Sequence, residues 1–247
     1  MTDTQRGANG RIVRSTGGWG RTDGHHAAEV PGPAAQAAIG YAERLGWPLA
    51  PGYAVDGEIC DCGAKQCPDY GAHPVPGAWR LASCATPTLV RVVWRMCTEA
   101  PVLAVLGRPV PGACRLGAVR APALVGVAAL EQLSKRSAME GPAVDGHGRI
   151  TFLVDLGIGP EALEEAEADF ARWQRAGLDL SVLGGPERLD YVPLPTPGHT
   201  GRAGVVWATP PAAGRALPPL AAVVEVIDRA VRSTYPGLWR TVHAKTA

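Results

Sequence analysis

Three cysteines and one histidine lie within fourteen residues of one another, in the segment CDCGAKQCPDYGAHP at positions 60–74. Their spacing is C-x-C-x4-C-x5-H, formed by Cys60, Cys62, Cys67 and His73. Thiolates and an imidazole are ligands that Zn²⁺ prefers, and four of them complete a tetrahedral site. The spacing therefore predicts a zinc knuckle. The alternative is a polar loop that carries free thiols.

A set of four protein ligands leaves no open coordination position, so we expect this zinc to be structural rather than hydrolytic. Metal binding would also stabilise a segment that is too polar to be held by apolar burial. The other three cysteines, Cys84, Cys97 and Cys114, lie on apolar segments. We interpret them as small core residues.

The composition limits the class of protein. The chain has 247 residues, of which 46% are hydrophobic, and a formal net charge of +1. This is enough for a folded core but does not give a globally basic surface. No stretch approaches the length of a membrane span, and the N-terminal segment lacks the apolar core of a secretion signal. We expect a cytoplasmic protein with no membrane partner, in which clustered cysteines favour metal over disulfide.

Charge is unevenly distributed along the chain. Residues 155–190 contain nine acids and three arginines, for a local charge of −6. Residues 80–120 contain one acid, Glu99, and six arginines, for a local charge of +5: Arg80, Arg91, Arg95, Arg108, Arg115 and Arg120. One hypothesis is that the middle of the chain faces phosphate groups. The alternative is two solvated faces.

Periodicity predicts the elements that must position these residues. The polar, Gly-rich and aperiodic residues 1–33 predict a disordered arm. Helical spacing of apolar residues predicts helices over about 34–45, 87–96, 122–136, 160–176 and 220–231. Short apolar runs predict strands within 46–55, 101–107, 113–119 and 148–157. Because strands and helices interleave, the expected class is α/β or α+β.

The helix that follows Thr86 is the most clearly marked, because Thr86 and Pro87 are typical of a helix N-terminus. Arg91 and Arg95, four residues apart, should lie together on one side of this helix. Its apolar face is expected to consist of Leu89, Val92, Val93 and Met96.

The chain resembles the N-terminal domain of bifunctional DNA primase/polymerase proteins, which belong to the archaeo-eukaryotic primase superfamily. The resemblance lies in the order of four segments: AIGYAERLGWPLAPG, then CDCGAKQCPDYGAHP, then a Thr-initiated helix that contains VVW, then PVLAVLG. The later segment LDYVPLPTPGHTGRAGVVW, at 189–207, is similar to the closing segment of the family domain. The resemblance covers about 34–210.

This resemblance implies an α+β fold with a primase-type core and an inserted zinc knuckle at 60–74. It divides the chain into the arm 1–33, a primase/polymerase-like domain at 34–210 and a C-terminal helical extension at 211–247. It further implies a role in DNA replication with DNA or a nucleotide as partner. The phosphate-binding candidates are Arg91, Arg95, Arg108, Arg115, Arg120, Arg149 and His199.

The chain departs from the family at the catalytic carboxylates. Family members hold two divalent cations, Mg²⁺ or Mn²⁺, on a DxD strand, and the matching positions here are Leu116 and Ala118. The position of a later family histidine is matched by Arg149, with His147 two residues earlier. We therefore expect that nucleic-acid or nucleotide binding is retained and that polymerisation is lost.

Two alternatives remain open. The chain could be an active template-dependent DNA primase/polymerase if Asp145, Asp155 or Glu99 held the catalytic metal ions. It could instead be a protein-docking module for a replication initiator or helicase. The missing carboxylates argue against the first alternative, and the arginines of the middle segment argue mildly against the second.

Overall fold

The computed structural model describes residues 31–56, 59–64, 67, 73–77, 86–110, 114–136, 140–157, 159–185, 188, 190–199 and 204–244. Within the chain, Pro31–Ala247 form one compact unit. The arm predicted over 1–33 falls, up to residue 30, outside the described residues.

Two helices near the start of the described chain lie where periodicity predicts them. Helix α1 (Pro33–Leu45) has a proline in its first turn and ends at Gly46, whose φ of 64° is a left-handed conformation that favours glycine. Helix α3 (Pro87–Met96) begins at Thr86, whose Oγ1 accepts a hydrogen bond from the Leu89 N–H at 3.3 Å. Local sequence signals thus determine both helix ends.

The buried face of α3 differs from the predicted one. Val90, Val93 and Trp94 are buried, whereas Val92 is 45% exposed and Met96 is 55% exposed. The expectation that Val92 and Met96 belong to the core is therefore wrong. Trp94 decides the face, since its large side chain is almost fully buried and its indole N–H donates to the carbonyl of Ala100 at 3.1 Å.

The first layer of strands is a three-stranded antiparallel sheet in the order β1-β4-β10. Its strands are β1 (Leu49–Pro51), β4 (Val102–Val105) and β10 (Tyr191–Pro193). Every residue of β4 is buried, as expected of a central strand covered on both sides. A separate two-stranded hairpin of β2 (Val55–Asp56) and β3 (Ile59–Cys60) follows β1 in the chain.

The second layer, in the described part of the chain, is a six-stranded antiparallel sheet in the order β11-β7-β8-β6-β5, with β9 also paired to β6. Its strands are β5 (Pro109–Val110), β6 (Cys114–Pro122), β7 (Ala143–Gly146), β8 (Arg149–Asp155), β9 (Ser181–Leu183) and β11 (Val206–Thr209). Strand β8 pairs with β6 from Leu116 to Pro122, and β5 and β9 share the other edge of β6. The α+β class is confirmed.

The central strand β6 contributes to two different cores. Val119 and Ala121 belong to the core formed with α4, α5 and α6, whereas Leu116 and Ala118 belong to the core formed with α1, α3 and the three-stranded sheet. Successive side chains of a strand point to opposite faces, which explains the division. Even-numbered residues of β6 thus face α1, α3 and the three-stranded sheet, and odd-numbered residues face α4, α5 and α6.

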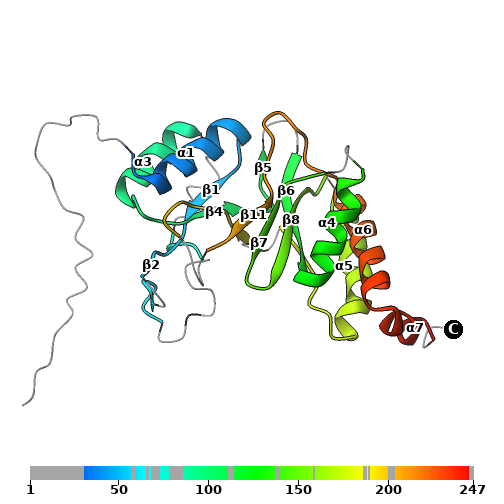
Figure 1. The fold of residues 1–247 in the computed structure, drawn as a ribbon. Coiled ribbons are helices and arrows are strands. Elements are labelled where there is room, and N and C mark those ends of the chain that lie inside the picture. Colours follow the sequence, from blue (N-terminus) through cyan, green and yellow to red (C-terminus); the bar gives the residue numbers. More distant parts are fainter. Residues whose placement is uncertain are drawn as a thin grey trace, which may run out of the picture. The chain divides into compact units, whose positions relative to one another are not determined.

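Four helices complete the described fold: α4 (Ala123–Ser134), α5 (Glu161–Arg175), α6 (Leu220–Thr234) and α7 (Pro236–Ala244). Helices α4, α5 and α6 cover one face of the six-stranded sheet (Figure 1). Helix α4 lies so close to β8 that a Cβ at Gly126 would collide with Ile150. Helix α6, within the segment 211–247, contributes buried residues along its length to this core.

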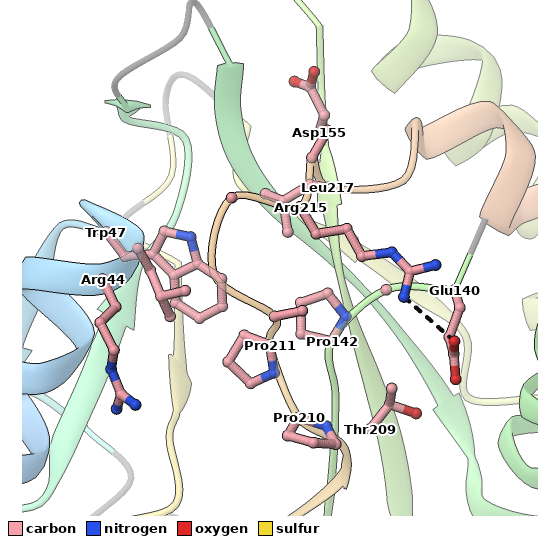
Figure 2. Close-up of a pocket in the computed structure, with 15 residues that line it drawn as sticks. Arg44, Trp47, Glu140, Pro142, Asp155, Thr209, Pro210, Pro211, Arg215 and Leu217 are labelled. Carbon is pink, nitrogen blue, oxygen red and sulfur yellow. Dashed lines mark hydrogen bonds and ion pairs between the residues drawn. The ribbon is translucent and has the colours of Figure 1, made fainter. Parts of the chain in front are cut away.

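A pocket of about 390 Å³ lies where α1 ends near the six-stranded sheet (Figure 2). Trp47 and Arg44 line it from the end of α1, and the segment that follows β11 lines it from the other side. Arg215 and Glu140, which form an ion pair at 3.3 Å, belong to the lining. The described lining therefore carries charges of both signs.

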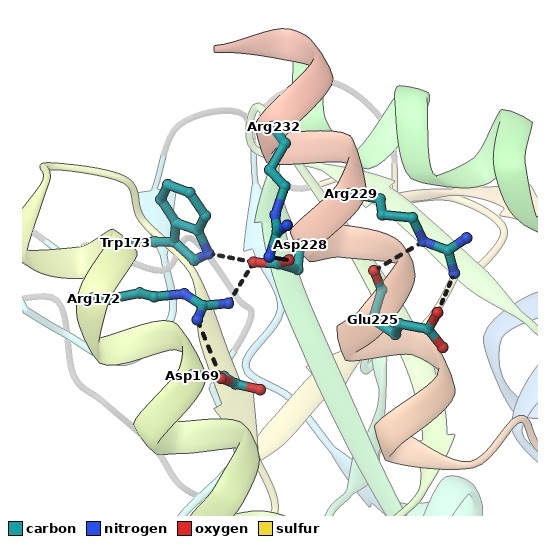
Figure 3. A network of polar contacts seen from close by, with 7 residues as sticks. All are labelled: Asp169, Arg172, Trp173, Glu225, Asp228, Arg229 and Arg232. Carbon is teal, nitrogen blue, oxygen red and sulfur yellow. Dashed lines mark hydrogen bonds and ion pairs between the residues drawn. The ribbon is translucent and has the colours of Figure 1, made fainter. Parts of the chain in front are cut away.

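Asp228 on α6 connects three side chains from neighbouring turns and helices (Figure 3). Its Oδ1 accepts hydrogen bonds from Arg172 at 2.6 Å and from the indole N–H of Trp173 at 2.9 Å, both on α5. Its Oδ2 pairs with Arg232 at 2.6 Å. The Asp228 side chain is only 14% exposed, so these bonds replace most of its hydration.

We expect Asp228→Asn to lower the free energy of unfolding by about 2 kcal/mol, because a largely buried carboxylate that accepts several charge-assisted bonds loses its charge. This figure is already reduced for the partial exposure of Arg172 and Arg232. Glu225→Gln is the matched control, since its pair with Arg229 is exposed and should contribute less than about 0.5 kcal/mol. Urea unfolding at pH 7 measures both. Equal effects of the two substitutions would contradict a stabilising role of Asp228.

Candidate functional site

The four predicted zinc ligands lie together in the structure. The ligand atoms of Cys60, Cys62, Cys67 and His73 are all within 4.8 Å of one another. His73 Nε2 lies 3.5 Å from the Cys60 Sγ and 3.2 Å from the Cys67 Sγ. Ligands of a tetrahedral zinc ion are about 3.4–3.8 Å apart, given metal–ligand distances of about 2.0–2.3 Å. The cluster could therefore hold a structural zinc ion with little rearrangement.

The β2–β3 hairpin and the turn after it position two of these ligands. Val55 pairs with Cys60 across the hairpin, and the Asp61 N–H donates to the carbonyl of Ala54 at 3.1 Å. Cys62 follows in this turn, where Gly63 adopts a φ of 75°. A non-glycine residue would be strained at this φ, so Gly63 allows the chain to fold back after two ligands in close succession.

Backbone hydrogen bonds to the extension of β1 hold the segment that carries His73. The Tyr53 N–H donates to the carbonyl of His73, and the Val75 N–H donates to the carbonyl of Pro51, both at 3.1 Å. A bridge between Gly52 and Pro74 lies between these bonds. The metal cluster is therefore attached directly to the end of β1, which pairs with β4 in the three-stranded sheet.

The cluster is half shielded from solvent. Cys60 and Cys67 are buried, and Cys62 and His73 are partly exposed. The ring of Tyr53 lies 4.7 Å from the imidazole of His73. The pKa of Tyr53 is raised, first by partial burial and then by the charges of nearby Cys62 and Cys60. With four protein ligands, the site would support the fold and would not activate water.

Of the remaining cysteines, Cys97 can be described in full. Its thiol donates to the carbonyl of Val93 at 3.1 Å, one turn earlier in the chain. Burial raises the pKa of this thiol to about 11, so it is neutral at physiological pH and a poor metal ligand. Cys97 was predicted to be a small core residue, and it is partly buried and packs against the core. Cys114 begins β6, and Cys84 lies outside the described residues.

Leu116 and Ala118, which the resemblance aligns with a DxD strand, lie on β6 and carry no carboxylate. Leu116 and Ala118 are fully buried in the core that α1 and α3 share with the sheet. A carboxylate at either position would be buried among apolar side chains. This part of β6 therefore offers no metal-binding acid at Leu116 or Ala118.

The three acids among which an active enzyme could find metal ligands do not form one cluster. The Oδ1 of Asp155 accepts the backbone N–H of Arg115 at 3.2 Å and that of Gly157 at 2.9 Å, which is a strand-end role. Asp145 on β7 and Glu99 after α3 are exposed. Among the described residues, the Cys60–His73 cluster is the one group of three or more His, Cys, Asp or Glu side chains near enough to share a metal ion.

The candidate arginines do not all gather at one place. Arg115 and Arg120 lie on β6 at odd and even positions, and therefore face opposite sides of the sheet. Arg91 on α3 forms an ion pair with Glu43 of α1. Arg95 is exposed on the same helix.

Three further candidates occupy separate positions. Arg108 follows Gly107 at the end of β4 and lies outside the strand. The imidazole of the partly exposed His199 donates to the carbonyl of Glu99 at 2.8 Å, which links its turn to the end of α3. Arg149 begins β8, and the pairing of β6 with β8 places it on the same face as Arg120. Arg80 lies outside the described residues.

The pocket beside Trp47 was not identified from the sequence. Its lining comes from distant segments, including Pro142, Asp155 and the loop of Pro210 and Pro211. The two prolines are the one signal for that loop, and they indicate a turn without indicating a ligand.

No protein-family model, curated protein or solved structure matched the chain in comparisons with known proteins. The interpretation of the site therefore rests on its residues and their geometry.

None of the described helices combines the length and the apolar character that a membrane span requires.

We expect about one zinc ion per chain in protein purified without added metal, because four suitable ligand atoms already lie within 4.8 Å of one another. Elemental analysis of the purified protein gives the stoichiometry. The cells should be grown in a medium that contains zinc. Less than about 0.1 zinc per chain in the purified protein would then show that the cluster holds free thiols.

Cys62→Ser should weaken zinc binding and lower the thermal midpoint by about 4–8 °C, because zinc binding and folding of the loop are coupled. The shift corresponds to a loss of about 2 kcal/mol in a domain of this size. Cys97→Ser is the control, since Cys97 lies outside the cluster and should leave the zinc content unchanged. Differential scanning calorimetry and elemental analysis measure the two effects. A Cys62→Ser protein with full zinc content and an unchanged midpoint would exclude Cys62 as a ligand.

Proposed function

We propose that this chain is a zinc-containing, primase/polymerase-like domain of DNA replication that binds nucleic acid or a nucleotide and does not polymerise. The observation that carries this proposal is the assembly of Cys60, Cys62, Cys67 and His73, with their ligand atoms within 4.8 Å of one another. The spacing of these ligands is that of the zinc knuckle in the primase/polymerase family which the sequence resembles.

The position of the knuckle supports the proposal. Backbone hydrogen bonds attach the cluster to the end of β1. Strand β1 belongs to the GWPLAPG segment, which resembles the family. The strand of the PVLAVLG segment is β4, which pairs with β1. The closing YVP segment is β10, on the other edge of β4. The segments that carry the resemblance are therefore neighbours in one sheet, although they are far apart in the sequence.

Loss of polymerisation is inferred from β6. Nucleotidyl transfer in this superfamily uses carboxylates to hold divalent cations against the attacking and leaving oxygens. Leu116 and Ala118 provide no such ligands and are fully buried. Mg²⁺ or Mn²⁺ would have a role only if other acids supplied the site, and Asp145, Asp155 and Glu99 are dispersed in the structure.

A second candidate function is a protein-docking module for a replication initiator or helicase. It is favoured by the exposure of Val92 and Met96 on α3, since large apolar side chains at helical spacing on a surface can mark an interface. The exposed Arg95 lies on the same helix. Under this hypothesis the protein would not bind DNA.

Two assays on the zinc-loaded protein test the proposal. In the first, primed template, deoxynucleotides and Mg²⁺ or Mn²⁺ should give no extended product, because the acids that would hold the metal ions are missing. In the second, labelled single-stranded DNA should bind at low salt and be released as salt rises, because phosphate contacts displace counterions. An extended product would contradict the loss of catalysis. Absence of DNA and nucleotide binding at low salt would favour the docking module.

A further inference from the structure

One face of the six-stranded sheet changes from apolar to polar along β6. Ala118 is fully buried, and two residues later on the same face Arg120 is partly exposed. Strand β9 changes in the same way, from Leu183 to Ser181, whereas Thr151 on β8 is polar but buried. Ala118 pairs with Leu153, whereas Arg120 pairs with Thr151 on β8 and with Ser181 on β9. Along β6 the apolar contact with the α1 and α3 layer therefore ends at Ala118, whereas on β8 and β7 burial continues through Thr151 and its partner Val144.

A second arginine lies on this face of the sheet, at the start of β8. Arg149 pairs with Pro122, two residues beyond Arg120 on the same face of β6. Residues in such a diagonal relationship on adjacent antiparallel strands are about 7–8 Å apart. Arg120 and Arg149 can therefore approach one bound group from two strands. Both are partly exposed.

An acidic side chain competes with a bound anion for Arg149. Asp179, two residues before Ser181, forms an ion pair with Arg149. Because β9 runs antiparallel to β6, Asp179 is level with Pro122, and the ion pair spans the end of β6. Both partners are partly exposed to solvent, so the pair contributes little to stability and can exchange for another anion.

We propose that Arg120 and Arg149, with the hydroxyl of Ser181 beside them, form a site for a phosphate ester that requires no divalent metal ion. This inference rests on the proposed function and locates its phosphate-binding site. Guanidinium groups are planar, remain charged and donate paired hydrogen bonds to phosphate oxygens. Since Leu116 and Ala118 offer no carboxylate through which a cation could bridge to phosphate, the arginines must neutralise its charge directly.

The phosphate could come from the backbone of a single DNA strand or from a nucleoside triphosphate. Both present the same anionic oxygens to the arginines, so the shared chemistry defines the site. Arg115 does not belong to this site, because it lies on the face of β6 opposite to Arg120. It also leaves Arg91 and Arg95 as a separate surface on α3.

Binding of a labelled oligo(dT) strand to the zinc-loaded protein, in buffer without Mg²⁺ or Mn²⁺, tests the site over a range of salt concentrations. Arg149→Gln and Arg120→Gln should each weaken binding about tenfold at low salt and reduce the salt slope by about one, because each removes one phosphate contact. Arg229→Gln is the matched control, since it removes the same charge from the exposed side of α6 and should leave binding unchanged. Zinc content and thermal midpoint confirm that each variant is folded.

Asp179→Asn gives an effect of opposite sign. Loss of this carboxylate frees Arg149, so we expect binding to tighten by about three- to tenfold. Arg120→Lys, which keeps the charge but not the planar fork, should fall between wild type and Arg120→Gln. A sheet face that is merely solvated would show neither effect.

Competition with dATP in the same buffer distinguishes the two sources of phosphate. Displacement of the strand by dATP assigns the site to the triphosphate, and persistence of the strand assigns it to backbone phosphates. If wild type binds while Arg120→Gln, Arg149→Gln and Asp179→Asn all match Arg229→Gln, the proposed site is wrong and the proposed function stands. If Arg91→Ala with Arg95→Ala abolishes binding instead, the site lies on α3. If wild type binds neither oligo(dT) nor dATP, the proposed function itself fails.

Discussion

The structure depends on a constraint at β6, which must bury both faces along part of its length. At Leu116 and Ala118 one face is closed by the α1 and α3 layer, while Val119 and Ala121 are closed by the helices on the other face. From Leu116 to Val119 each residue must be apolar or small, because a charged side chain would lose its hydration without gaining a partner. Beyond Ala118 only the helix-covered face remains apolar, and Arg120 follows.

This division separates a packed part of β6 from a part that carries an arginine. Where the two layers meet, apolar packing encloses Leu116 and Ala118, and a carboxylate there would lose its hydration. Where they separate, the same strand presents an arginine beside Thr151 and Ser181. The Cys3His cluster is attached elsewhere, at the end of β1. A zinc ion there would order the knuckle against the three-stranded sheet and would take no part in phosphate binding.

Features that depend on local sequence could be predicted. Four ligands within fourteen residues can meet without help from the rest of the fold, and the cluster forms as expected. Thr86 and Gly46 mark helix ends through their own hydrogen bonds and φ angle, and these ends also lie where predicted. The prediction of the buried face of α3 was wrong because two rows of apolar residues fit the same helix. Only the packing of Trp94 against the neighbouring layer decides between them.

Features that depend on distant pairing could not be predicted. The arginines of the middle segment form a cluster in sequence, yet alternation along β6 sends Arg115 and Arg120 to opposite faces. That separation follows once 114–122 is known to be one strand. The proximity of Arg149 to Arg120 requires the register of β8, and the ion pair with Asp179 requires the place of β9. No spacing in the sequence encodes these pairings.

A zinc ion held by Cys60, Cys62, Cys67 and His73 would support the fold and would have no open coordination position for catalysis. X-ray absorption at the zinc edge of the purified protein tests it most directly. The account predicts three sulfur ligands at about 2.3 Å and one nitrogen at about 2.0–2.1 Å, with no water in the coordination shell. A shell that contains an exchangeable oxygen ligand, or fewer than three sulfurs, would contradict it.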